Sequence, residues 1–144
     1  MKKTLIAMAM ALASTSAMAE LDSESATVSM DVALFASITN LDDFVLNPVS
    51  SDGAAGSIYS GSDTYNLESN GQVRVTLSGS DLSNGSDSIS TAYALDDSGL
   101  TFDTTADSVH NANHTVSADA TLGNISAQKA GSYSGTITLT VSGI

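Results

Sequence analysis

The sequence contains no cysteine and no tryptophan among its 144 residues, and it has a single proline. Because cysteine is absent, no disulfide framework stabilises the fold, and thiol chemistry is excluded as a function. The buried tryptophan packed on an inter-sheet disulfide, which marks antibody-type domains, is excluded as well. The fold must therefore be held by the packing and hydrogen bonding of the remaining residues.

Basic residues are also scarce. They are limited to Lys2, Lys3, Arg74 and Lys129, whereas all sixteen acidic residues follow residue 19. The chain after residue 19 therefore carries a formal charge of 2 − 16 = −14. A field of this sign repels nucleic acid and anionic lipid surfaces, so nucleic-acid binding is excluded. The same charge keeps a β-rich protein soluble and opposes unwanted association.

Long apolar runs are missing except near the start of the chain. Lys2 and Lys3 precede an apolar run at residues 5–13, and Ala17-Met18-Ala19 follows it. This order predicts a secretory signal peptide at residues 1–19, with a retained short anchor as the alternative. The remaining 144 − 19 = 125 residues, 20–144, suit a single domain. No later run is long enough to span a membrane, so we expect an exported protein without a membrane span after cleavage.

The most regular pattern in the sequence lies at its end. Tyr133, Ile137, Leu139 and Val141 share one parity, and serine or threonine occupies the other parity from residue 132 to residue 142. Such alternation predicts a half-buried antiparallel strand over residues 131–142. At about 3.3 Å per residue this strand would be roughly 35 Å long. We expect it to be the longest strand and the centre of the fold.

Residues 26–35 form the second-best strand pattern. Ala26, Val28, Met30, Val32 and Leu34 alternate with polar residues that include Asp31. Further along, residues 64–78 predict a hairpin around Asn70-Gly71, a dipeptide that accepts the positive φ angles of a type I′ turn.

The second half of the chain predicts further short strands. They are expected at residues 88–95, from Leu100 to Phe102 and at residues 115–122, with a turn at 96–99 and a polar loop at 103–113. No segment keeps helical spacing for more than two turns. Several short strands separated by polar turns predict an all-β, immunoglobulin-like antiparallel β-sandwich.

Residues suited to catalysis are few. His110 and His114 fall in the predicted polar loop, where they read as solvated, and no G-x-S-x-G elbow is present. We therefore expect neither an enzyme nor a cofactor. The acidic pairs read as solvated turn residues, with calcium binding through their oxygens as the alternative; they are Asp42-Asp43, Asp96-Asp97 and Asp103 with Asp107.

Two segments together resemble a known family. The ending A-G-S-Y-S-G-T-I-T-L-T-V-S resembles the C-terminal strand of bacterial fimbrial major subunits, in particular the chaperone–usher class that contains the colonization factor antigens. Residues 26–34, A-T-V-S-M-D-V-A-L, resemble the N-terminal donor segment of those subunits, which also typically lack cysteine. Spore coat U-like proteins share the general pattern, although they usually carry cysteines.

The resemblance implies an incomplete sandwich whose missing strand is supplied by a neighbouring subunit. It implies that the inserting side chains are Val28, Met30, Val32 and Leu34. It places one edge of the acceptor groove at Tyr133, Ile137, Leu139 and Val141. The expected assembly is a head-to-tail homopolymer, a fimbria (pilus) on the bacterial cell surface that serves adhesion or biofilm formation. A periplasmic chaperone and an outer-membrane usher are its expected partners.

A second interpretation remains open. Residues 26–34 also fit an ordinary first strand that pairs within its own domain, and the short acidic lead at 20–25 and the charge of Asp31 favour that pairing. The protein would then be a monomeric exported β-sandwich in the periplasm or the medium. It would act as a binding module that recognises a glycan or a protein through its loops.

Overall fold

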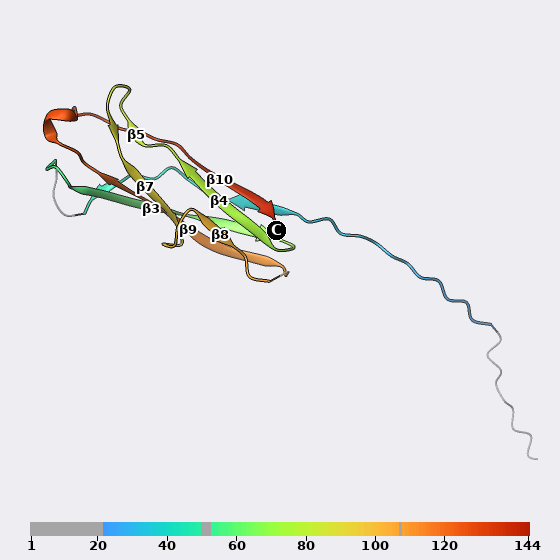
Figure 1. Cartoon of the computed structure of the whole chain (residues 1–144). Helices are drawn as coiled ribbons and strands as arrows, with labels where there is room; N and C mark the ends of the chain where they lie inside the picture. Colours follow the sequence, from blue (N-terminus) through green and yellow to red (C-terminus); the bar gives the residue numbers. More distant parts are fainter. Residues whose placement is uncertain (1–21, 50–52, 107) are drawn as a thin grey trace, which may run out of the picture. The chain divides into compact units, whose positions relative to one another are not determined.

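The structure is a computed structural model that describes residues 22–49, 53–106 and 108–144 (Figure 1). The predicted signal peptide at residues 1–19 lies outside the described residues. The chain divides into two units, Met1–Asp31 and Val32–Ile144. Within the first unit, residues 22–31 form no strand and are exposed. The second unit contains every strand found among the described residues.

Val32–Ile144 folds as two antiparallel sheets, which confirms the predicted all-β sandwich class. The larger sheet has the order β1 (Ala36–Thr39), β3 (Ile58–Ser69), β9 (His110–Thr121) and β7 (Thr91–Leu95), and β2 (Asn47–Pro48) also pairs with β3. The smaller sheet has the order β10 (Ile137–Gly143), β4 (Val73–Gly79) and β8 (Thr101–Asp103). A separate ribbon joins β5 (Leu82–Ser83) to β6 (Ser88–Ile89), and a 3-10 turn, η1, covers Ile125–Ala127. Among the described residues, no helix is long and apolar enough to cross a membrane.

One apolar core lies between the two sheets. The larger sheet contributes Tyr65, Leu67, Leu95 and Val116, and β4 contributes Val73, Val75 and Leu77. All seven side chains are almost fully buried. Alternation within β3, β4 and β9 thus places one parity in the core and the other in solvent, as a half-buried strand requires.

The expected hairpin at residues 64–78 is wrong, because β3 and β4 belong to different sheets. The non-glycine residues with positive φ in the described part of the chain are Asn40, Asp96, Asp97 and Ala106. Asn70 therefore lacks the left-handed conformation that a type I′ turn needs. Instead, the Ser69 hydroxyl donates to the Gly71 carbonyl at 2.7 Å while the chain crosses from one sheet to the other. The crossing lets the apolar faces of β3 and β4 bury each other. The expected turn at 96–99 is confirmed, with positive φ at Asp96 and Asp97.

The longest strands are β3 and β9, with 12 residues each, and not the C-terminal strand as expected. β10 has 7 residues. Its partner β4 ends at Gly79, where an added Cβ would come within 2.5 Å of the Tyr93 ring. Only part of the alternating pattern at 131–142 therefore becomes strand.

Tyr65, Phe102 and His114 bring aromatic rings from both sheets together. The His114 ring centroid lies 4.3 Å from that of Phe102 and 5.6 Å from that of Tyr65. Among the described residues, the Tyr65 hydroxyl is the one buried side-chain polar atom without a hydrogen-bond partner. Burial, with a smaller contribution from Asp96, raises the pKa of Tyr65 to about 12.

We predict that Tyr65→Phe leaves the free energy of unfolding unchanged or raises it by about 1 kcal/mol, because it removes an unsatisfied buried hydroxyl. The raised pKa means that the folded protein holds the phenol proton more tightly than the unfolded chain. The wild type should therefore lose stability as pH rises from about 10 to about 12, and the variant should lose less. Urea unfolding at neutral and alkaline pH measures both effects. A loss of more than about 1.5 kcal/mol at neutral pH would mean that the hydroxyl has a partner in solution.

Candidate functional site

The open side of β10 is the most unusual feature of the sandwich. β10 pairs with β4 along its whole length, from Ile137 opposite Gly79 to Gly143 opposite Val73. Among the described residues no strand pairs with its other side, so β10 is an edge strand (Figure 1). An edge presents unpaired N–H and C=O groups on which a further strand can form.

The register of β10 identifies the main-chain groups that face this open side. Ser80 N–H donates to the Thr136 carbonyl at 3.0 Å, and Ile144 N–H donates to the Gln72 carbonyl at 3.4 Å. In an antiparallel ladder, alternate residues turn both main-chain polar groups toward the same neighbour. Even-numbered residues of β10 therefore face β4. The N–H and C=O groups of Ile137, Leu139 and Val141 face the open side.

The side chains of the same odd-numbered residues face the core. Ile137, Leu139 and Val141 are half-buried and pack against the buried cluster, whereas Thr138 and Thr140 are exposed. Tyr133, the fourth residue of the predicted groove edge, is also half-buried, and its hydroxyl donates to the Lys129 carbonyl at 2.8 Å. One parity thus contributes both the apolar side chains and the free main-chain groups.

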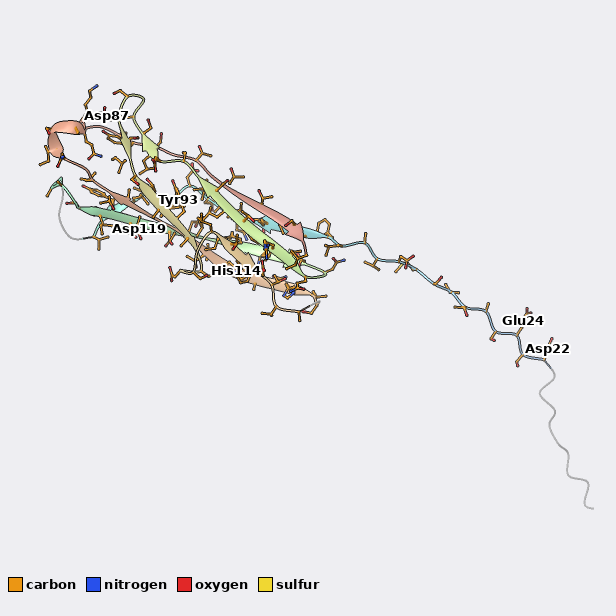
Figure 2. All side chains as sticks on the ribbon, viewed as in Figure 1. Asp22, Glu24, Asp87, Tyr93, His114 and Asp119 are labelled. Carbon is orange, nitrogen blue, oxygen red and sulfur yellow. The ribbon has the colours of Figure 1, made fainter. Side chains whose placement is uncertain are left out.

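A cavity of about 890 Å³ lies beside the beginning of β10. Its lining includes Leu41 and Phe44 from the segment after β1, Ile137 from β10, and Tyr59, Tyr93 and Tyr133. Tyr93, labelled in Figure 2, is held in place because its hydroxyl donates to the Ser80 carbonyl at 2.6 Å. Burial, with a smaller contribution from Asp81, raises the pKa of Tyr93. The cavity is therefore a largely apolar groove with positioned aromatic walls.

A smaller cavity of about 180 Å³ lies near the end of β10. Leu34, Ala36, Val73, Val141 and Gly143 line it. The Leu34 side chain packs over Gly143, where an added Cβ would come within 2.6 Å of Leu34 Cδ2. The chain that leads into β1 thus covers β10 at Gly143, whereas the larger cavity lies beside Ile137.

The strand order shows where a further strand could be added to the sandwich. In an immunoglobulin-type sandwich, strands A, B, E and D form one sheet, and strands C, F and G form the other. Here β1, β3, β9 and β7 follow the order of A, B, E and D, while the smaller sheet has the order β10, β4 and β8. Among the described residues, no strand lies on the open side of β10. A further strand added there would pair with Ile137, Leu139 and Val141.

The predicted donor residues lie in a segment that forms no strand. Residues 26–35, expected as the second-best strand, form no strand in the described part of the chain, and β1 begins only at Ala36. The exposed fractions are 94% for Val28, 83% for Met30, 72% for Val32 and 53% for Leu34. Leu34 differs from the other three, since it packs on Gly143 of its own domain. The alternating apolar side chains of the segment thus remain largely uncovered.

His110 and His114 do not lie in a loop, which corrects the expectation for both residues. Both belong to β9. The His114 side chain is 13% exposed, and its Nδ1 lies 2.7 Å from Asp96 Oδ2. Asp96 Oδ1 also accepts the Thr115 N–H at 2.8 Å, so this carboxylate closes the 96–99 turn onto β9. The sequence pattern missed this pair because its partners are 18 residues apart.

Among the other acidic pairs, Asp103 binds an arginine, and Asp42 makes a main-chain hydrogen bond. Arg74 Nε lies 2.6 Å from Asp103 Oδ1, and the hydrogen bond from Arg74 lowers the pKa of the Asp103 carboxyl. Asp42 N–H donates to Asp63 Oδ2 at 2.7 Å. Asp107 lies outside the described residues. Within the described residues, no group of three or more His, Cys, Asp or Glu side chains is placed to hold a metal ion.

Comparison with known proteins gives no family assignment: no protein-family model matches the chain, and no curated protein matches it significantly.

We predict that amide protection alternates along β10 in the monomeric protein. The amides of Thr138, Thr140 and Ser142 donate within the ladder to β4 and should exchange slowly. Those of Leu139 and Val141 face the open side and should exchange on the order of tenfold faster or more. Hydrogen exchange followed by NMR measures this directly. Uniform protection along β10 would show that another strand already covers the edge.

Proposed function

We propose that the protein is a structural subunit of a bacterial surface fibre that assembles by donor-strand complementation. The observation that carries the proposal is that the protein has both a strand edge without a neighbour and a segment with a strand pattern but no partner. β10 has an open edge beside an apolar groove of about 890 Å³, and residues 26–32 carry alternating apolar side chains without a strand partner. A second copy of the chain supplies what each feature lacks.

The lengths of the two features agree. Residues 26–32 comprise as many residues as the seven of β10, roughly 20 Å at about 3.3 Å per residue. Main-chain hydrogen bonds to Ile137, Leu139 and Val141 supply register, and Val28, Met30 and Val32 enter the groove. Burial of three such side chains contributes at most about 4–9 kcal/mol before the costs of association.

The position where the chain leaves the sandwich determines the direction of the donor. Leu34 packs on Gly143, so the chain leaves beside the C-terminal end of β10. In a head-to-tail fibre of identically oriented subunits, that end faces the N-terminal end of β10 in the next subunit. Val32 then enters near Ile137, with Val28 nearer Gly143, and the donor runs antiparallel to β10.

The proposed interface is heterologous, because the donor segment and the groove are different surfaces. Such an interface generates an open filament and not a closed dimer. A subunit with an open edge also needs protection before assembly. This requirement supports a periplasmic chaperone and an outer-membrane usher as partners, export as the route, and adhesion or biofilm formation as the role of the fibre.

A binding module is the second candidate function. The groove volume falls within the roughly 300–1,000 Å³ range of small-molecule sites, and Tyr59, Tyr93 and Tyr133 line it. Tyrosine rings with fixed hydroxyls are suitable contacts for a glycan or a peptide. A monomeric exported protein would use the same groove for that ligand, so the assembly state decides between the two functions.

We predict that Val32→Asp abolishes fibre assembly and leaves the domain folded, because Val32 is 72% exposed in the subunit. Material sheared from producing cells is run on a denaturing gel with and without boiling. The wild type should give a ladder that collapses on boiling, since donor-strand interfaces dissociate slowly. Val32→Asp should give only the monomer.

The matched control is Ser29→Asp, which adds the same charge at an exposed position of opposite parity. It should keep the ladder, because this side chain faces away from the groove in the proposed interface. A ladder that persists in Val32→Asp would rule out insertion of Val32. A wild type that is monomeric in both lanes would favour the binding module.

The antiparallel direction leads to a further prediction. A copy of residues 22–34 is joined after Ile144 through a turn of about two to five residues, in a chain that carries Val32→Asp in its N-terminal copy. The appended segment should fold back along β10 and raise the free energy of unfolding by several kcal/mol, at most about 4–9. Denaturant unfolding measures the gain. The same fusion with Asp in place of the appended valine serves as the control, and equal stability of the two fusions would contradict the proposed insertion.

A further inference from the structure

The Asn70-Gly71 dipeptide has no turn to form, yet Asn70 makes an unusual set of contacts. Phe35 N–H donates to Asn70 Oδ1 at 2.7 Å. Asn70 Nδ2 donates to the Ala33 carbonyl at 2.9 Å. Asn70 N–H donates to the Phe35 carbonyl at 3.1 Å. One residue thus binds three main-chain groups of the segment that precedes β1.

These contacts extend the ladder between β1 and β3. The paired register begins with Ala36 opposite Ser69, so Asn70 and Phe35 are the next positions along the two chains. The Asn70 side-chain amide takes the place of a further peptide group and reaches Ala33. Residues 22–32, which precede Ala33, form no strand. Asn70 therefore forms the last rung of the intramolecular sheet.

Leu34 provides a second attachment at the same place. Its side chain packs over Gly143, and it lines the cavity of about 180 Å³ with Val73 and Val141. Together the contacts of Ala33, Leu34 and Phe35 fasten three consecutive residues to the sandwich. Val32 is the first residue before this attachment, and it is 72% exposed.

We propose that Asn70 is a positioning residue that ends the intramolecular sheet at Ala33 and so makes Val32 the first residue available to a neighbouring subunit. The inference rests on the proposed donor-strand function. When Asn70 holds this segment, Ala33 is bound to its own domain and the adjacent Val32 is the first residue to insert into the neighbour. No linker residues then lie between the two subunits. Release of Ala33, Leu34 and Phe35 would lengthen the joint by about 10 Å of extended chain.

The consequence is a stiff joint. A subunit connected through a single peptide unit has few ways to rotate against its neighbour, whereas three freed residues behave as a short flexible linker. Asn70 thereby influences the flexibility of the fibre without touching the groove that accepts the donor.

The test compares Asn70→Ala with Asn84→Ala in the full chain. Asn84 belongs to the other Asn-Gly dipeptide with a similar local role, since its Oδ1 accepts the Asp87 N–H at 3.1 Å within the ribbon of β5 and β6. Hydrogen exchange is measured in monomers that also carry Val32→Asp. Asn70→Ala should accelerate exchange of the Phe35 amide on the order of tenfold or more and leave β9 amides unchanged. Asn84→Ala should leave Phe35 unchanged.

Electron microscopy then measures the bending of fibres that retain Val32. Asn70→Ala fibres should form but have a shorter persistence length than wild-type and Asn84→Ala fibres. A residue that only stabilised the domain would alter the unfolding midpoint and not the bending of the fibre. Unchanged Phe35 exchange, or unchanged bending, overturns the positioning role.

Two further measurements keep the inference testable if Asn70→Ala does not fold. Asn70→Asp keeps an acceptor for Phe35 N–H but has no N–H for the Ala33 carbonyl, so it should give an intermediate acceleration. In the Val32→Asp protein with Asn70 intact, Phe35 should exchange far more slowly than Val28, and equal rates overturn the inference. Persistence of fibres in Val32→Asp would instead refute the donor-strand function itself, so the two failures are distinguishable.

Discussion

The packing of β4 against the larger sheet is the contact on which the rest of the domain depends. Val73, Val75 and Leu77 fill the space against Tyr65, Leu67 and Val116, and β4 pairs with β8 on one side and β10 on the other. β10 is held by hydrogen bonds to β4 and by its half-buried side chains, and no other strand of the described residues pairs with it. The domain can therefore leave one edge open, because its most buried strand lies one position inward from that edge.

Alternation in the sequence predicted the faces of the strands but not their neighbours. Because alternate residues of a strand lie on the same face, the pattern correctly places Ile137, Leu139 and Val141 together toward the core. Pairing depends on contacts between distant residues, so Asn70-Gly71 appeared to be a local turn although β3 and β4 occupy different sheets. His114 was misplaced for the same reason, since the carboxylate that binds it follows a different strand. Residues 26–35 have the pattern of a strand without forming one, and no local signal distinguishes a strand that lacks a partner in its own domain.

The net negative charge of the protein opposes unwanted pairing at the open edge of β10. Only Arg74 and Lys129 offset the acidic residues after residue 19, and Arg74 is already paired with Asp103. Like-charged surfaces oppose indiscriminate edge-to-edge pairing, which is the hazard of any uncovered strand. A donor that carries few charges among its inserting residues experiences less of this repulsion than a whole acidic surface would. In the proposed donor segment, Asp31 would face away from the groove, because it lies on the other face of the strand from Met30 and Val32.

Odd- and even-numbered residues of β10 have different roles, and this difference affects which substitutions the strand can accept. Odd-numbered residues provide the core contacts and the free main-chain groups, while Thr138, Thr140 and Ser142 show their side chains to the surroundings. The hydrogen-bonding groups at the edge belong to the backbone and are the same for any non-proline residue. The exterior of this strand can therefore change in size and polarity while its edge keeps the same hydrogen-bonding pattern.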